Sequence, residues 1–527
     1  MTNATVSELL KRGLGYLARD DFAAAEAIAD RLAADFDSTA EIVVFAGEVQ
    51  FRRGRYARAL QIVESASDAH PRRIEIGLLR CRALLALGRL AEARDLAIEI
   101  SRDEITDEQH VQVLVTILTG CLQPEAAYPL AKASAKRHPH SASAQRRFAI
   151  NCQATGHTDE GLAAADAAIR LDPHDYEMLG LRSALRTATA DDNHIDELEA
   201  LLTAGCRTPI GAARAAYALA KELEDIGRYE RAFSVLQAGA SLKRQTLQSS
   251  LQKDLDMIRA LQTQYTAEVI ERGPSGDDTR EPVFVLGLPR TGSTLLERML
   301  ASHSEIYSAG ELLHFEAELM IGLHKLGTSD APTDIVANST RLDPAELGRR
   351  YLDRTRSHTG HTQHFIDKRP LNHLWLGAIR RALPNATAIH VRRTPMDACY
   401  AIFKFLFEDT YPWSYSLEEI ALYYLNYRQL MDHWRSIMPG YIVDIAYEDL
   451  VHDPEAATRL LTEKIGVDWQ PRMLDFHQSA SATMTGSATQ VRREIYKSSI
   501  GRWRSYEKEL GQLSEILEAA GIDPYTP

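Results

Sequence analysis

The sequence predicts two folds in one chain: an N-terminal all-α superhelix of repeats and a C-terminal α/β domain of three layers with a mainly parallel sheet. Small residues recur every 34 residues through the first half. A segment rich in glycine, proline and charge follows. From Val283 onward, short apolar runs alternate with helical patterns, as in βαβ units. We expect a repeat array over 1–270, a linker over 271–282 and a second domain over 283–527.

The repeats have the marks of tetratricopeptide repeats. A glycine precedes several of the periodic small residues by five positions, and a proline follows several by twelve. This pattern fits a helix–turn–helix unit with one close helix contact. We expect six or seven repeats over about 5–245, the sixth irregular around 191–209, and a closing helix over 248–272. The periodic residues are Ala25, Ala59, Ala93, Ala127 and Gly161, with Gly54, Gly88, Gly156, Pro71, Pro139 and Pro173 around them.

Such repeats bury their apolar faces by stacking on one another, which produces a superhelix with a concave groove. We expect a peptide or protein to bind in this groove. The alternative is that the array is a structural module, including one that forms a homodimer.

Composition limits the partners and the compartment. The chain has 527 residues and a formal net charge of −13, which indicates no broad attraction to nucleic acid or to an anionic membrane. The cysteines are widely spaced, so neither a disulfide framework nor a zinc site is expected. The first residues lack the apolar region of a signal peptide, and no run of about 18 apolar residues follows. We therefore expect a cytoplasmic protein; the cysteines are Cys81, Cys121, Cys152, Cys206 and Cys399.

The second domain contains a phosphate-binding loop. The apolar run VFVL is followed by GLPRTGST, residues 287–294, and then by a helical pattern. A strand, a glycine-bounded loop and a helix start direct backbone amides toward an anion. Ser293 stands where a nucleotide-hydrolysing loop has its lysine, and the cation is Arg290 within the loop. A kinase is the alternative on the octet alone; the loop fits better an anhydride donor with one transferable group and no metal.

The stretch VFVLGLPRTGSTLLERM, residues 283–299, resembles the 5′-phosphosulfate loop of sulfotransferases that use 3′-phosphoadenosine 5′-phosphosulfate (PAPS). Its proline–arginine–x–glycine–hydroxyl form is similar to that of tyrosylprotein sulfotransferases. The resemblance implies a P-loop-like sulfotransferase domain in which the donor binds to Arg290, Thr291, Gly292, Ser293 and Thr294.

Residues 386–403 resemble the 3′-phosphate motif of the same superfamily. The resemblance assigns the phosphate to Arg392 and Arg393, with Lys404 as a further cation. Ala401 stands where the family has a serine, so the way in which the 3′-phosphate is held stays open.

Two further stretches complete the resemblance. FIDKRPLN, residues 365–372, resembles a segment whose lysine approaches the transferring group, so Lys368 receives that role. Residues 489–510 are similar to the segment that closes over the donor, with Gln490, Val491 and Trp503 aligned. Gly501 replaces the family's serine, and Lys497, Ser498, Ser499 or Arg502 could supply its contact. Tyr447 resembles the tyrosine near the adenine.

The catalytic base follows from the tyrosylprotein enzymes, in which a glutamate follows the loop helix. The corresponding position, 21 residues after Arg290, is Glu311. Small-molecule sulfotransferases use a histidine, so the alternatives are His303, His314, His364 and His373. The predicted catalytic residues are thus Glu311, Arg290 and Lys368.

Together these motifs predict transfer of the sulfuryl group from PAPS, without a metal, to an acceptor hydroxyl, which we expect to be a tyrosine in a polypeptide. A carbohydrate or small-molecule hydroxyl is the second candidate. A nucleotide-binding scaffold with weak catalysis is the third, because of Ala401 and Gly501.

Overall fold

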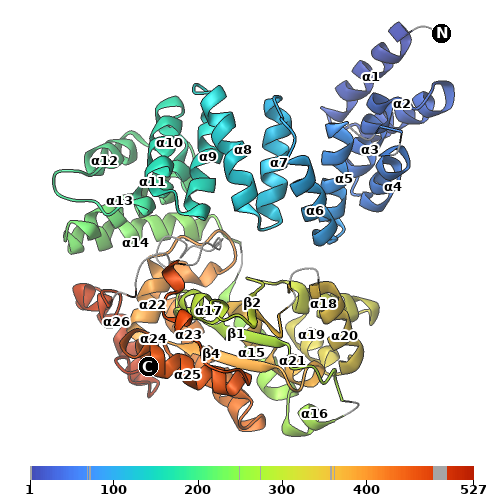
Figure 1. Ribbon diagram of the computed structural model, residues 1–527. Coiled ribbons are helices and arrows are strands. Elements are labelled where there is room, and N and C mark those ends of the chain that lie inside the picture. Colours follow the sequence, from blue (N-terminus) through green and yellow to red (C-terminus); the bar gives the residue numbers. More distant parts are fainter. Residues whose placement is uncertain are drawn as a thin grey trace. The chain divides into compact units, whose positions relative to one another are not determined.

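The computed structural model describes most of the chain (Figure 1). Pro71, Gln490 and Val491, which the sequence analysis singled out, lie outside the described residues. The described residues are 3–67, 69–70, 73–248, 250–272, 275–356, 359–360, 362–478, 495 and 497–527.

The described chain packs into two compact units, the first ending at Asp172 and the second beginning at Pro173. The unit boundary therefore lies inside the repeat array, well before the linker predicted at 271–282. The last helices of the array belong to the same compact unit as the α/β domain.

The first unit consists of consecutive helix pairs, in agreement with the tetratricopeptide pattern. Each helix contacts the next, and α3 also contacts α5, so the pairs stack. Ala25, Ala59, Ala93 and Ala127 are fully buried where helices meet. The helices are α1 (Asn3–Leu17), α2 (Phe22–Asp35), α3 (Ala40–Arg52), α4 (Tyr56–Ser67), α5 (Ile74–Ala86), α6 (Leu90–Ile100), α7 (Glu108–Gly120), α8 (Pro124–Arg137), α9 (Ala142–Thr155) and α10 (Thr158–Leu171).

The turn inside each pair needs a left-handed residue. Gly54, Gly88 and Gly156 have φ of 73°, 74° and 83°. The equivalent positions in two other pairs are Asp20 and Leu122, each with φ of 57°. The turn geometry thus persists where the glycine is absent, at a cost of about 1–2 kcal/mol for a side chain in this conformation.

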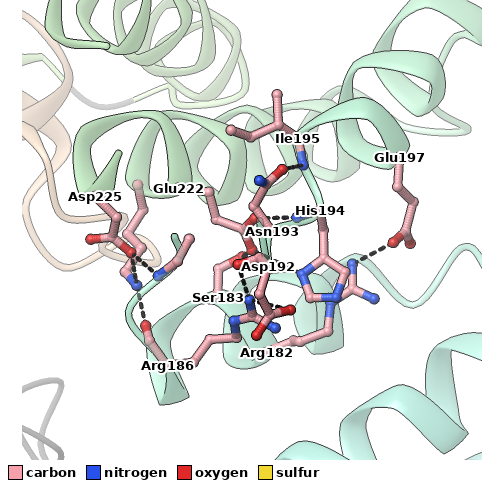
Figure 2. Close-up of polar contacts among 12 residues, drawn as sticks. Arg182, Ser183, Arg186, Asp192, Asn193, His194, Ile195, Glu197, Glu222 and Asp225 are labelled. Atoms are coloured by element: carbon pink, nitrogen blue, oxygen red, sulfur yellow. Dashed lines mark hydrogen bonds and ion pairs between the residues drawn. The ribbon is translucent and has the colours of Figure 1, made fainter. Parts of the chain in front are cut away.

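The irregular sixth repeat lies in the second unit. It contains α11 (Tyr176–Leu185) and α12 (Ile195–Ala204), and both helices contact α13 (Pro209–Asp225). Its loop is held by Glu222, which accepts hydrogen bonds from Ser183 Oγ at 2.8 Å and from the His194 amide at 2.6 Å (Figure 2). Burial alone would raise the pKa of Glu222, but these hydrogen bonds lower it below its usual range. The array ends with α14 (Tyr229–Gln245), after a turn at Gly227.

The helix expected over 248–272 is in fact two helices, α15 (Leu251–Gln264) and α16 (Ala267–Glu271). It also does not close the array, because α15 packs against α19 (Pro332–Ser339) and α23 (Leu417–Ile437). The buried Tyr265 ring, just after α15, contacts Trp434 with ring centroids 5.5 Å apart, and its hydroxyl lies 2.9 Å from Ser339 Oγ. These buried contacts explain why the segment joins the α/β domain.

The α/β domain is built on a five-stranded sheet in the order β2-β3-β1-β4-β5, and every pair of neighbours is parallel. The apolar runs after Val283, Ala386 and Tyr441 become β1, β4 and β5, as predicted. The strands are β1 (Pro282–Gly287), β2 (Ile306–Ser308), β3 (His364–Lys368), β4 (Thr387–Arg392) and β5 (Ile442–Ala446).

Helices cover both faces of this sheet, which gives the predicted three layers (Figure 1). On one face, α17 (Ser293–Ala301) and α25 (Pro454–Ile465) bury a core of aliphatic side chains with β1, β3 and β4. On the other, Phe284 of β1 contacts Phe315 and Tyr351 of α18 (His314–Lys325) and α20 (Pro344–Thr355). The other α-helices of the described part of this domain are α21 (Leu376–Ala382), α22 (Pro395–Phe403), α24 (Tyr447–His452) and α26 (Gly511–Ala519).

Because the strands are parallel, their carboxyl ends meet at one edge, where open α/β sheets bind their ligands. The residues that end or directly follow β1, β3, β4 and β5 there are the loop 287–292, Lys368, Arg392 and Tyr447. Motifs distant in sequence are thus brought to one edge of the sheet.

Candidate active site

The loop after β1 is tightly constrained. Gly292 has φ of 100°, and a Cβ at this position would lie 2.3 Å from Cδ2 of Tyr447. Arg290 also takes positive φ, 66°, which is strained for a residue with a side chain. The Thr291 hydroxyl donates to the Leu288 carbonyl at 2.8 Å. The loop then enters α17, whose N-cap is Gly292, so no side chain of the cap residue occupies the first amides. A helix N-terminus of this kind is a favourable place for an anion.

Lys368 ends β3, the neighbour of β1, and its side chain is almost wholly buried. Its Nζ contacts the Glu311 carboxylate and lies 3.7 Å from Glu297 Oε2. Glu297, on α17, is oriented by a hydrogen bond from Ser308 Oγ at 2.6 Å. The structure therefore brings together the predicted base and the predicted catalytic lysine. Glu297 was missed, although it lies one turn after Ser293 in the loop helix.

Asp367, which precedes the lysine, is fully buried. Tyr351 OH donates to its carboxylate at 3.0 Å and Asn372 Nδ2 at 3.2 Å. Burial raises the pKa of Asp367 to about 7, in spite of these hydrogen bonds. Asp367 thus anchors the end of β3, a role that the sequence analysis did not assign.

The two arginines at the end of β4 face different partners. Arg392 Nε lies 3.8 Å from Asp444 Oδ1. Arg393 donates to the Arg290 carbonyl at 3.0 Å and to the Ser499 carbonyl at 2.6 Å, and its guanidinium lies 4.8 Å from the centre of the Tyr447 ring. Within the described residues, the Nε atoms of both arginines are buried without a hydrogen-bond partner. Arg393 links the loop to the segment around Ser499.

That C-terminal segment lies against the start of α22. Tyr447 OH and Ser499 Oγ are 2.6 Å apart. Asp397, on α22, accepts hydrogen bonds from the amides of Gly501 at 2.6 Å and Trp503 at 3.4 Å. Gly501 has φ of 72°, which disfavours the serine of the family. Lys497 and Ser498 are exposed.

Arg502 and Lys404 both pair with Glu224, which carries no recognisable motif in the sequence. Both donate to Glu224 near the end of α13, Lys404 Nζ at 2.8 Å and Arg502 Nη2 at 3.1 Å. Ala401, in α22, lies three residues before Lys404 and is half-buried.

The four histidines that are alternatives to Glu311 have partners of their own. His303, His364 and His373 bond the carbonyl groups of Asp468, Arg280 and Pro370, and His314 bonds Thr355 Oγ1. Burial lowers the pKa of His373 to about 4. His373 is therefore a neutral core residue.

A run of three aromatic side chains begins next to Arg290. The Arg290 guanidinium lies 4.6 Å from the centre of the Phe405 ring. Phe405 contacts Phe407, and Phe407 contacts Tyr411, with ring centroids 4.6 and 4.8 Å apart. Burial, together with the charge of Glu311, raises the pKa of Tyr411. We call Phe405, Phe407 and Tyr411 the aromatic ledge; its two phenylalanines are half-exposed.

Among the residues that the structure describes, no cluster of three or more histidine, cysteine or acidic side chains could hold a metal ion. Nor does any described helix have the length and apolarity needed to span a bilayer.

Comparisons with known proteins agree with this architecture. Residues 282–471 match the sulfotransferase family model, and residues 50–114 match a tetratricopeptide repeat model. An uncharacterized protein of Aquifex aeolicus is 32% identical over 62% of this chain, which spans only 44% of that protein's length. A putative protein-tyrosine sulfotransferase of Caenorhabditis briggsae is 23% identical over 46% of this chain and 89% of its own length.

Among solved structures, the sulfotransferase domain of the curacin biosynthetic pathway is 18% identical, covers 47% of this chain and 99% of its own, and has a TM-score of 0.34. With the family match, the parallel sheet and the repeat helices taken together, the chain carries a domain of the sulfotransferase family joined to tetratricopeptide repeats.

Proposed function

We propose that this chain transfers the sulfuryl group of PAPS to the hydroxyl of a tyrosyl residue in a polypeptide. The contact between Lys368 and Glu311 carries the proposal. A buried ammonium group and a half-exposed carboxylate meet at the carboxyl edge of β3, next to the strand that leads into the loop 287–292. This combination offers a cation for a leaving group and a base for an acceptor proton in one place.

The residues of the edge fit the donor. The loop amides of residues 291–294 and the start of α17 would bind the 5′-phosphosulfate, with Arg290 neutralising its charge. Arg393 would take the 3′-phosphate, since its buried Nε lacks a partner among the described residues. Tyr447, against the loop at Gly292, would lie near the adenine. Ser499 is held by both Arg393 and Tyr447, which supports its assignment to the donor site.

In the proposed reaction the phenolic oxygen attacks sulfur opposite the phosphate. The new O–S bond forms as the bond from sulfur to the bridging phosphate oxygen breaks. The electron pair of that bond leaves with 3′-phosphoadenosine 5′-phosphate, and Glu311 accepts the phenolic proton. Lys368 and Arg290 stabilise the charge that develops on the transferring and leaving oxygens. Positioning and electrostatics supply most of the catalysis in such a transfer.

The aromatic ledge favours tyrosine over a sugar as the acceptor. Partly exposed phenylalanine rings, one beside Arg290 and the other against Tyr411, can hold a phenol ring edge to face. The similarity to a putative protein-tyrosine sulfotransferase points the same way. The groove of the tetratricopeptide repeats would bind the polypeptide that carries the tyrosine.

The test is mass spectrometry of a peptide library incubated with PAPS, with wild type and Glu311→Gln compared. We expect sulfated tyrosine with wild type and a loss of about 10²- to 10⁴-fold in kcat for the variant. The exposed Glu305 lies six residues earlier, and Glu305→Gln is the matched control, with activity like that of wild type. Transfer only to sugars would overturn the proposal that tyrosine is the acceptor. Nucleotide binding without any transfer would indicate that the chain is a scaffold.

A further inference from the structure

Glu224 connects two elements of the candidate donor site from outside the α/β domain. Its Oε1 accepts from Lys404 Nζ at 2.8 Å and from Arg502 Nη2 at 3.1 Å. Its Oε2 accepts from Tyr400 OH at 2.6 Å and from Tyr506 OH at 2.8 Å. The Glu224 side chain is only 12% exposed. One carboxylate of the repeat array thus receives four side-chain donors.

These donors come in two sets. Tyr400 and Lys404 lie in and directly after α22, the helix that follows Arg392 and Arg393. Arg502 and Tyr506 lie in the 3₁₀ helix η6 (Arg502–Tyr506), which follows Ser499. Glu224 therefore fastens the C-terminal segment to α22, as Asp397 does through the amides of Gly501 and Trp503.

The surroundings of Glu224 make these bonds strong. Tyr506 contacts Tyr400, Phe233 and Tyr229, with ring centroids 4.7, 5.8 and 5.5 Å apart, so aromatic rings shield the carboxylate from water. Charge-assisted hydrogen bonds in such a place are worth more than exposed ones. Burial opposes ionisation of Glu224, but the charge and hydrogen bond of Lys404, the hydrogen bond of Tyr400 and the charge of Arg502 lower its pKa to about 2.

We propose that Glu224 is a positioning residue for donor binding: it holds the segment 499–506 against α22, so that Ser499 stays bonded to Arg393 and Tyr447. This inference rests on the proposed function, because it assumes that these residues surround the donor. The last helix pair of the repeat array is then part of the donor site's framework.

The experiment must separate this role from the opposite relationship between Glu224 and the donor. If Lys404 and Arg502 bound the 3′-phosphate directly, Glu224 would compete with the phosphate for them. Removing its charge would then tighten donor binding. The two relationships predict effects of opposite sign on nucleotide affinity.

Glu222 provides a matched control on the same helix. It is also a buried glutamate, but its carboxylate bonds Ser183 and His194 in the irregular repeat (Figure 2). Glu222→Gln should therefore weaken the fold of the repeat while leaving the nucleotide site unchanged.

The experiment measures binding of 3′-phosphoadenosine 5′-phosphate to the full chain by calorimetry, with hydrogen exchange of the amides of Gly501 and Trp503. For Glu224→Gln we expect a Kd raised by about tenfold, the effect of losing roughly one charge-assisted hydrogen bond, and faster exchange at both amides. Tyr506→Phe should also raise the Kd and the exchange rates, by a smaller amount. It replaces Glu224→Gln in the test if that variant does not fold. Glu222→Gln should change neither.

Unchanged or tighter nucleotide binding by a folded Glu224→Gln, with the wild type binding normally, would overturn the inference and leave the proposed function intact. A wild-type chain that does not bind the nucleotide would overturn both.

Discussion

Lys368 and Glu311 meet at the candidate active site although 57 residues separate them in the chain. The lysine side chain is 1% exposed and the glutamate side chain is 47% exposed. A charge as deeply buried as that of Lys368 must be paired with an opposite charge. Here the carboxylates of Glu297 and Glu311 both pair with it. The half-exposed carboxylate of Glu311 can therefore meet an acceptor without leaving the ammonium group unpaired.

Replacing Lys368 by methionine tests the role of this cation. Methionine has a similar length, so we expect a folded protein whose kcat falls by about 10²- to 10³-fold, as for the loss of one group that stabilises transition-state charge. Steady-state kinetics with PAPS and a tyrosine peptide would measure this change. Lys325→Met, at an exposed position at the end of α18, should leave kcat unaltered. An equal kcat in the two variants would remove Lys368 from the mechanism.

Burial of the Asp367 carboxyl should make the free energy of unfolding depend on pH. Burial raises the pKa of its carboxyl in the folded protein to about 7, whereas in the unfolded chain it titrates near pH 4. Between these values the folded state holds the proton that the unfolded state has released. The contribution of Asp367 to stability is therefore largest below about pH 4, falls as the pH rises and levels off above about pH 7.

The measurement is the free energy of unfolding in urea at about pH 5 and about pH 8. Asp367→Asn should lose less stability than wild type between these two values. The exposed Asp353 offers a control, since Asp353→Asn should keep the slope of wild type. Parallel curves for wild type and Asp367→Asn would show that the carboxyl titrates normally.

We expect a substitution at Leu122 to stabilise the repeats. Leu122 takes φ of 57° at a turn where other repeats have glycine, and the residue is 43% exposed. Leu122→Gly relieves the left-handed strain, which outweighs the loss of a partly exposed side chain, so we expect a net gain of up to about 1 kcal/mol in the free energy of unfolding. Gly88→Ala, the reverse change at an equivalent turn, should lose a similar amount. Chemical unfolding followed by circular dichroism measures both, and a destabilised Leu122→Gly would refute the explanation.

We expect a change in the aromatic ledge to weaken binding of the acceptor peptide but not binding of the nucleotide. Phe407→Ala should raise KM for a tyrosine peptide by about tenfold, since edge-to-face contacts and burial of a phenol ring contribute roughly 1–2 kcal/mol. The Kd for 3′-phosphoadenosine 5′-phosphate should stay the same, because Phe407 contacts Phe405 and Tyr411 rather than the loop 287–292. If nucleotide affinity fell while KM for the peptide did not, the ledge would belong to the donor side.

Local patterns predicted the fold well. The 34-residue period gave the helix pairs, and alternating apolar runs gave β1, β4 and β5, because both signals depend on neighbouring residues. β2 and β3 were not predicted as strands: β2 has three residues, and β3 contains the charged pair Asp367 and Lys368. The left-handed turns at Asp20 and Leu122 were missed because neither residue carries the glycine signal.

Contiguous motifs supplied the candidate site residues, whereas partners that lie far away in the chain were missed. Resemblance supplied Glu311 and Lys368, and the structure adds their contact. Glu297, Asp367 and Glu224 acquire their roles only through tertiary neighbours; Glu224 and Tyr506 are 282 residues apart. Burial and partners of this kind leave no mark in the local sequence.

The most direct test of the central claim is a crystal structure of the protein soaked with 3′-phosphoadenosine 5′-phosphate at millimolar concentration. We predict the 5′-phosphate at the amides of residues 291–294, with the 3′-phosphate against Arg393. Density for the nucleotide at another place on the protein, or none in crystals that leave this edge of the sheet open, would contradict the assignment of the loop as the donor site.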